Sequence, residues 1–125
     1  DALKQRQKNV AEADDDALAR VGWARSGFVM AGFPPRSGAD RHRCFEAVAH
    51  SAVPSVIFES PRRVEATLAD LAHACGPDRR ALVAKDLTKT HERVVIGTLS
   101  TPIGQARGEY VVVVDALRAG DASMP

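Results

Sequence analysis

The sequence predicts an α/β domain in which a mixed β-sheet of about five strands is flanked by helices. Short apolar runs rich in β-branched residues recur along the chain, and the strongest is Tyr110 to Val114. Stretches with apolar residues at helical spacing separate the first three runs. The resulting order, strand–helix–strand–helix–strand–strand–helix–strand, is typical of a layered α/β sheet. No G-x-G-x-x-G follows any run, so the pattern is not that of a dinucleotide-binding half.

The composition indicates one globular domain with no general attraction for nucleic acid. The chain has 125 residues, 45% of them hydrophobic, and a formal net charge of +1. No apolar run approaches the roughly 20 residues of a membrane span. We expect a leader of uncertain structure over residues 1–16, one domain over 17–117 and a disordered tail over 118–125. We interpret Cys44 and Cys75 as reduced, packed thiols of a cytoplasmic protein; a disulfide or a metal pair is the alternative.

The first predicted strand–helix–strand unit lies between Gly27 and Phe58. The apolar run Gly27–Phe33 ends at two prolines, which is the punctuation expected after a buried strand. Apolar residues at helical spacing then predict an amphipathic helix over Ala39–Ser51. Val53–Phe58 is continuous and β-branched, so we expect a strand covered on both faces.

The next helix has recognisable signals at both ends. Ser60 stands at the predicted N-cap and Pro61 at the first helical position, where its missing N–H costs nothing. The apolar stripe runs as far as Cys75, and Gly76-Pro77 follows it as a stop signal. The sequence therefore predicts a helix over residues 61–75.

The remaining elements are strands, with one short helix among them. Ala81–Lys85 and Arg93–Leu99 are predicted strands, and Gly97 is a possible bulge in the second. A short helix is predicted over Pro102–Ala106. Tyr110–Val114 is so uniformly apolar that we expect it in the middle of the sheet.

Two polar clusters follow two of these strands. The first is Phe58-Glu59-Ser60-Pro61-Arg62-Arg63, and the second is Lys85-Asp86-Leu87-Thr88-Lys89-Thr90-His91-Glu92. The carboxyl ends of strands in an open α/β sheet are where loops gather polar groups around a ligand. The two clusters together therefore predict a site at this edge of the sheet.

The first cluster allows two interpretations for its acidic residue. In the functional interpretation, Glu59 accepts a hydrogen bond from a ligand. In the structural one, it pairs with Arg62 or Arg63, or it accepts from backbone N–H groups of the following turn. Ser60 is more readily a helix cap than a nucleophile, because no G-x-S-x-G surrounds it.

Positive charge is concentrated around the predicted site. Arg62 and Arg63 lie in the first turn of a helix, where they oppose the helix dipole, and this indicates an anion nearby, either a carboxylate of the chain or a phosphate. The alternative is a salt-paired or solvated surface. A basic rim for phosphate would draw on Arg36, Arg41, His42, Arg43, Arg62, Arg63, Lys85 and Lys89.

The second cluster contains the only histidine in a predicted loop. His91 has a side chain suited to proton transfer at neutral pH, although a surface role is the alternative. The other histidines fall on predicted helices without metal-ligand spacing, so we expect no metal site.

These motifs resemble those of the ribosomal small-subunit RNA cytidine 2′-O-methyltransferases, a branch of the tetrapyrrole-methylase superfamily. Phe28 to Pro35 is similar to the segment F-x-x-x-G-F-x-P, and F-E-S-P-R-R at 58–63 resembles [FY]-E-[SA]-P-H-R. K-D-L-T-K-T-H-E at 85–92 resembles R-E-L-T-K-x-H-E, and Gly97-Thr98-Leu99 matches a following tripeptide. The stretch from Gly108 to Asp115 resembles the closing G-E-[FY]-V-[LV]-V-V-E, so the resemblance covers roughly residues 17–116.

The chain departs from this pattern in three ways. Arg62 stands where the branch has histidine, and Ala31 stands where it has an acidic residue. Residues 1–16 match nothing in the family's N-terminal half, which carries a glycine- and proline-rich cofactor loop. We therefore expect this chain to be the C-terminal domain, with the N-terminal domain of the same enzyme as its partner.

The resemblance implies the C-terminal domain of the tetrapyrrole-methylase fold, with S-adenosyl-L-methionine in a cleft between two domains and one wall supplied by this chain. It also implies homodimers and methyl transfer to a ribose 2′-hydroxyl of small-subunit ribosomal RNA. The reaction needs a proton acceptor, and the catalytic candidates are Lys89, His91, Glu59 and Glu92. The implied RNA-binding residues are Arg36, Arg62, Arg63 and Lys89. The implied cofactor-binding residues are Phe33, Pro34, Glu59, Ser60, Asp86, Leu87, Thr88, Gly108 and Glu109.

Two other functions stay open on the sequence. One is methylation of a tetrapyrrole ring, a corrin or porphyrin precursor. The other is a non-catalytic module for dimerisation or RNA docking, which the expected absence of the cofactor loop favours for the chain by itself.

Overall fold

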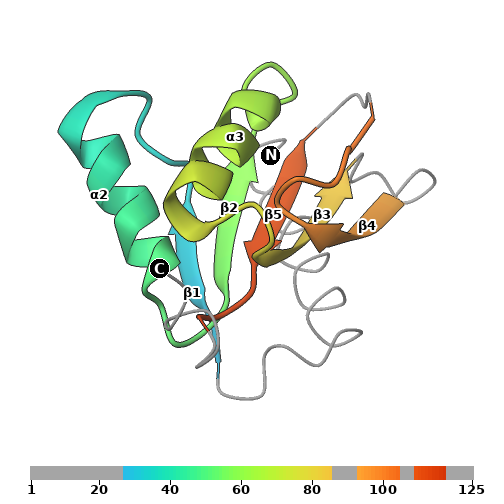
Figure 1. Ribbon diagram of the computed structural model, residues 1–125. Helices are drawn as coiled ribbons and strands as arrows, with labels where there is room; N and C mark the ends of the chain where they lie inside the picture. The colour runs from blue at the N-terminus through green and yellow to red at the C-terminus, as the bar shows by residue number, and fades with distance from the viewer. Residues whose placement is uncertain (1–26, 86–92, 105–108, 118–125) are drawn as a thin grey trace, which may run out of the picture.

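The computed structural model describes residues 27–85, 93–104 and 109–117, which form one sheet and two helices (Figure 1). The sheet has five strands in the order β1-β2-β5-β3-β4. The predicted mixed α/β sheet is confirmed. In chain order the elements are β1 (Val29–Gly32), α2 (Gly38–Ala49), β2 (Ser55–Glu59), α3 (Val64–Cys75), β3 (Arg80–Lys85), β4 (Arg93–Thr98) and β5 (Tyr110–Val114).

The strand directions bring several strand ends to one edge of the sheet. β1 and β2 are parallel, whereas β5 is antiparallel to both β2 and β3. β1, β2 and β3 therefore run in the same direction, and β4 and β5 run in the opposite one. As expected from its valines, β5 is the middle strand. The carboxyl ends of β1, β2 and β3 thus share an edge with the amino ends of β4 and β5.

The core has two parts because β-strand side chains alternate between the faces of the sheet. Both α2 and α3 cover one face, as Figure 1 shows. Leu71 of α3 is buried there against Tyr110, Val112 and Val114 of β5. Val111 alternates with them and is buried on the opposite face, in a cluster that includes Val56, Leu82, Ala84 and Val113. β2 and β5 are therefore buried on both sides, which explains their continuous apolar sequences.

Helix α3 begins three residues later than the sequence predicts. Its N-cap position is Arg63, and no side chain caps it. The carbonyl of Ser60 accepts hydrogen bonds from the N–H groups of Arg63 and Val64, so residues 61–63 form a separate turn before the helix. The prediction of Ser60 as a side-chain cap is wrong, since this turn moves the first helical residues away from its hydroxyl.

Two further predictions differ from the structure in the segment after β3. Gly97 is not a bulge, because β4 pairs with β3 in unbroken register. A Cβ atom at Gly97 would lie 2.4 Å from the Thr101 Oγ1 atom, so the glycine permits a close approach. The described part of the predicted helix at 102–106 is not helical, and Gly104 has a φ of +68°, outside the α-helical region.

The opposite edge of the sheet, which we call the closed end, is held by charged side chains. Arg79 is only 6% exposed and donates to the carbonyls of Ala49 and Asp115 at 2.8 and 3.2 Å. The Arg80 Nε atom donates to the Asp115 carboxylate at 2.9 Å. These contacts tie the end of α2 and the end of β5 to the start of β3.

The remaining expectations concern the two cysteines, membrane spans and the two ends of the sequence. Cys44 and Cys75 are free and partly buried. Neither helix in the described ranges has the length and apolar character needed to cross a bilayer. The leader at 1–16 and the tail at 118–125 lie outside the described residues.

Candidate functional site

The edge that gathers the strand ends, here called the strand-end edge, contains a row of three polar side chains. Glu59 of β2 and Lys85 of β3 each pair with Tyr110 of β5, so the three residues stand at one register across three adjacent strands. Directly opposite residues in antiparallel strands point to the same face, and here that is the face covered by the helices. The expectation that separate strand ends meet at one edge is confirmed for these residues.

Glu59 is buried in this row and its carboxylate is occupied. The side chain is 3% exposed. Its Oε1 atom accepts from the backbone N–H of Ser60 at 3.0 Å, and Oε2 accepts from the Thr67 hydroxyl at 2.7 Å. Of the two interpretations left open by the sequence, the bond to a backbone N–H of the following turn is the one observed. No ion pair joins Glu59 to Arg62 or Arg63 within the described residues.

Lys85 is the second buried charge of the row. It is 6% exposed and its ammonium donates to the carbonyl of Ile103. A Cβ atom at Gly104 would come within 3.3 Å of the Lys85 Nζ atom, so the segment after β4 lies directly against the lysine. Lys85 therefore does not belong to an exposed basic rim, contrary to prediction.

The residues after β1 provide the exposed aromatic part of the edge. Phe33 is 64% exposed, and its ring meets that of Phe58 edge-on with centroids 5.6 Å apart. Pro34 is buried. β1 ends at Gly32, whose positive φ of +72° turns the chain as the register against β2 shifts.

The other predicted site residues fall into two groups. Ser60 and Glu109 are half-buried at the strand-end edge, one directly after β2 and the other directly before β5. Outside the described residues lie Asp86, Leu87, Thr88, Lys89, His91, Glu92 and Gly108.

The predicted basic rim is smaller in the structure. Arg36 and Arg62 are exposed and Arg63 is half-buried. Arg41 is held inward, with only 12% of its side chain exposed, by Asp70 and other partners. Arg43 pairs with Asp40 on its own helix. The prediction is therefore wrong for Arg41 and Lys85, because both side chains are committed to contacts within the domain.

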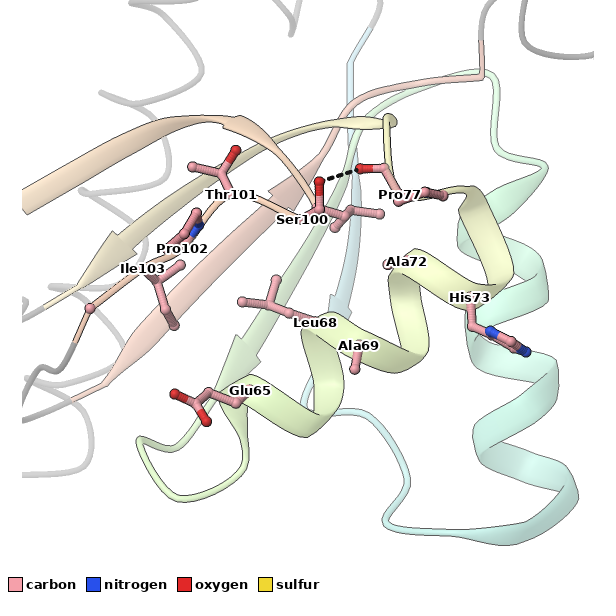
Figure 2. Close-up of a pocket in the computed structure, with 12 residues that line it drawn as sticks. Glu65, Leu68, Ala69, Ala72, His73, Pro77, Ser100, Thr101, Pro102 and Ile103 are labelled. Carbon is pink, nitrogen blue, oxygen red and sulfur yellow. Dashed lines mark hydrogen bonds between the residues drawn. The ribbon is translucent and has the colours of Figure 1, made fainter.

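A separate groove of about 700 Å³ runs along the exposed side of α3 (Figure 2). Leu68 of the helix points toward Ile103 across it, and Glu65 lies at the end nearest the start of α3. Among the described residues, no arginine or lysine lines it. We do not place RNA there, since phosphate binding needs positive charge.

No group of three or more metal-ligating side chains gathers in the described part of the chain.

The comparisons with known proteins fit this architecture. The family model of the tetrapyrrole (corrin/porphyrin) methylases matches residues 15–103. The chain belongs to this family. The matched segment includes β1 to β4, both helices and the polar cluster after β2.

Several curated relatives of this chain share one name. Proteins named ribosomal RNA small subunit methyltransferase I from Neisseria meningitidis serogroup B and Mycobacterium bovis are each 39% identical to it over 78% of the chain. The protein of that name from Xylella fastidiosa is 32% identical over 86% of the chain. The chain spans 35%, 36% and 42% of the length of these three relatives.

Sequence reasoning missed Thr67, which connects Glu59 to the rest of the domain. Thr67 is fully buried in α3 and lies between Val64 and Leu71 at the spacing of the apolar stripe. A hydroxyl at such a position needs a hydrogen-bond partner, and this was the available signal. The identity of that partner depends on the tertiary structure.

Proposed function

We propose that this chain is the C-terminal domain of an S-adenosyl-L-methionine-dependent methyltransferase that acts on a ribose 2′-hydroxyl of small-subunit ribosomal RNA. The single observation that supports this most is the common register of Glu59, Tyr110 and Lys85, which brings the strand ends to one edge. The shared name of the relatives supports the substrate class. The strand-end edge would form one wall of a cleft, and an N-terminal domain would form the other.

The residues at this edge fit a methyl donor that contains an adenosine. Backbone groups of the loops beyond the last strand pairs can read a purine or a carboxylate wherever the sheet ladder and the turns do not already use them. Phe33 presents an exposed aromatic ring suitable for contact with a flat base. When bound, S-adenosyl-L-methionine supplies an electrophilic methyl group, and the chain's part is to orient it toward the ribose oxygen.

The burial of Glu59 assigns it a supporting role in this proposal. Its two carboxylate oxygens already accept hydrogen bonds from Ser60 and Thr67, so it fixes the start of the turn at 60–63. A 2′-hydroxyl is weakly acidic, and its proton needs an acceptor near the attacking oxygen. We propose Lys89 and His91, in the second polar cluster, as the candidates for that role.

Cofactor titration tests the division of the site. We expect weak or undetectable binding of S-adenosyl-L-methionine to this chain alone in titration calorimetry. Binding should become sub-millimolar when the chain is joined to the N-terminal domain, because the second wall is then present. Tight binding by the chain alone would contradict the shared cleft.

RNA contact is assigned to Arg36, Arg62, Arg63 and Lys89, and a double substitution tests it. In the complete enzyme, Arg63→Ala with Lys89→Ala should weaken RNA binding more than cofactor binding, because phosphate contacts contribute most of the affinity for RNA. Arg43→Ala is the matched control, since Arg43 pairs with Asp40 on its own helix and is not one of the four assigned residues. Unchanged RNA affinity in the double variant would remove the assignment.

The family match leaves methylation of a tetrapyrrole ring as the second candidate, because the matching model describes corrin and porphyrin methylases. Mass analysis of the methylated product separates the two substrates. Homodimer formation belongs to the proposal as well, and sedimentation of the complete enzyme tests it. A complete enzyme that binds RNA but transfers no methyl group would instead indicate a docking module.

A further inference from the structure

Arg41 connects three separate parts of the domain next to the strand-end edge. Its Nη1 atom donates to the carbonyl of Pro35, in the loop after β1, at 2.9 Å. Its Nε and Nη2 atoms donate to the Asp70 carboxylate at 3.0 and 2.8 Å, and Nη2 also donates to the Thr67 hydroxyl at 3.2 Å. The guanidinium lies 4.6 Å from the ring centroid of Phe45 on its own helix.

The hydrogen bonds of Arg41 connect through Thr67 and Glu59 to the strand-end edge. Thr67 accepts from Arg41 and donates to Glu59, and Glu59 in turn accepts from the backbone N–H of Ser60. Each donor and acceptor in this series has the polarity that its neighbour requires. The loop after β1 and the turn after β2 are thus linked through one guanidinium.

Only an arginine side chain can make this set of contacts. Its planar fork offers five N–H groups in fixed directions, and here they reach a carbonyl in the loop after β1 and both a hydroxyl and a carboxylate on α3. A lysine at the same position has one ammonium and cannot span all three partners. The pair with Asp70 alone would be a weak surface contact, because the Asp70 side chain is about half exposed.

We propose that Arg41 is a positioning residue for the methyl-donor site: it sets the loop after β1 against the turn after β2 without touching the cofactor. The inference rests on the proposed function, because Phe33 and Pro34 in that loop and Ser60 in that turn belong to the proposed cofactor wall. Arg41 acts on the loop after β1 through the Pro35 carbonyl. It acts on the turn after β2 through Thr67 and Glu59.

The test compares variants of the complete enzyme by steady-state methyl transfer to small-subunit ribosomal RNA and by thermal melting. Arg41→Met keeps the length of the side chain and its contact with Phe45 but removes the fork. We expect the KM for S-adenosyl-L-methionine to rise about tenfold, with a smaller change in kcat and in the KM for RNA. The KM of Arg41→Lys for S-adenosyl-L-methionine should lie between those of the wild type and Arg41→Met.

Two further variants separate positioning from a general loss of structure. Arg43→Ala removes an exposed arginine from the same helix and should leave kcat and the KM for S-adenosyl-L-methionine unchanged, since its partner among the described residues is Asp40. Thr67→Val keeps the shape of the buried side chain but interrupts the series between Arg41 and Glu59. It should raise the KM for S-adenosyl-L-methionine in the same direction as Arg41→Met, and it provides the test if Arg41→Met does not fold.

The outcomes distinguish the two proposals. Wild-type enzyme that transfers no methyl group to RNA overturns the proposed function and this inference with it. An active wild type whose Arg41→Met and Thr67→Val variants keep their KM for S-adenosyl-L-methionine within twofold overturns the positioning role alone. The positioning role is also overturned if these variants have a lower melting temperature and a smaller active fraction, while the enzyme that remains active has the wild-type kcat and KM values.

Discussion

The two ends of the sheet both contain buried charged side chains but use them differently. At the closed end, Arg79 donates to two backbone carbonyls and Arg80 pairs with Asp115. At the strand-end edge, Glu59 and Lys85 are equally buried, but the loop after β1 is open to solvent: Phe33 is the most exposed large hydrophobic residue of the described chain.

The difference separates charges that hold the fold from charges that shape a surface. The contacts of the closed end join the end of α2 and the end of β5 to the start of β3. Those of the strand-end edge fix loops whose outer sides remain accessible. A buried charge is therefore not by itself a sign of a site; what decides is whether the segments it fixes are exposed.

The largest effect on stability is expected at the closed end. Arg79→Ala removes two hydrogen bonds from a buried charged group and leaves two carbonyls without their donor. We expect the free energy of unfolding to fall by about 3 kcal/mol. Urea denaturation of the chain measures it, with Arg43→Ala as a control that should stay within about 0.5 kcal/mol. A loss no larger than that of the control would contradict the distinction between the two ends.

A smaller effect should follow from Gly97→Ala, in β4 near the closed end. The new Cβ atom would lie 2.4 Å from the Thr101 Oγ1 atom, and Thr101 in turn accepts from the Thr98 N–H. We expect a loss of about 2 kcal/mol from the forced displacement. The double variant with Thr101→Ala should recover part of this loss in the same denaturation assay. Equal losses in the single and double variants would show that the contact is not the cause.

The thiol of Cys75, at the end of α3, reports on the closed end through its pH dependence. Burial raises the pKa of Cys75 above 9.0, nearby Arg79 lowers it in part, and Glu46 raises it slightly. Between 9.0 and the folded-state pKa the unfolded chain loses this proton while the folded chain keeps it, so stability falls as pH rises through that window. The fall in urea midpoint between pH 8 and pH 10 should be smaller in Cys75→Ser. An identical fall would mean that other groups account for it.

The smallest effect is expected at the strand-end edge itself. Ser60→Ala should change the free energy of unfolding by less than about 0.5 kcal/mol, because α3 begins at Val64 without a side-chain cap. A true N-cap serine would cost about 1 kcal/mol on the same substitution. Denaturation curves distinguish these two losses. The larger loss would show that the Ser60 side chain does cap α3.

The sequence predicted the strands and the helical face well, because each depends on local patterns. The valines of Tyr110–Val114 indicated a central strand, and the apolar spacing of α2 and α3 indicated two covering helices. The ends of elements were less predictable: Ser60-Pro61 has the local signature of a helix start, but a turn intervenes.

The contacts of the candidate site were predicted less completely, because they join residues far apart in the chain. Arg41 meets Thr67 and Asp70 across 26 and 29 positions, and a basic side chain in a polar segment gives no sign of these partners. Lys85 likewise ends its strand beneath Ile103, so a residue expected in a rim is buried. The polar composition of the strand-end edge followed from sequence, whereas the orientation of its side chains required the fold.

The central position of β5 has a consequence for how the domain is made. This strand joins β2 to β3, yet it is the last of the described strands to leave the ribosome during synthesis. Without Tyr110–Val114, the pair of β1 with β2 and the pair of β3 with β4 have no strand between them, and each leaves an unpaired strand edge. A nascent chain stalled before this point should therefore be a ready target for chaperones, and emergence of β5 should release it.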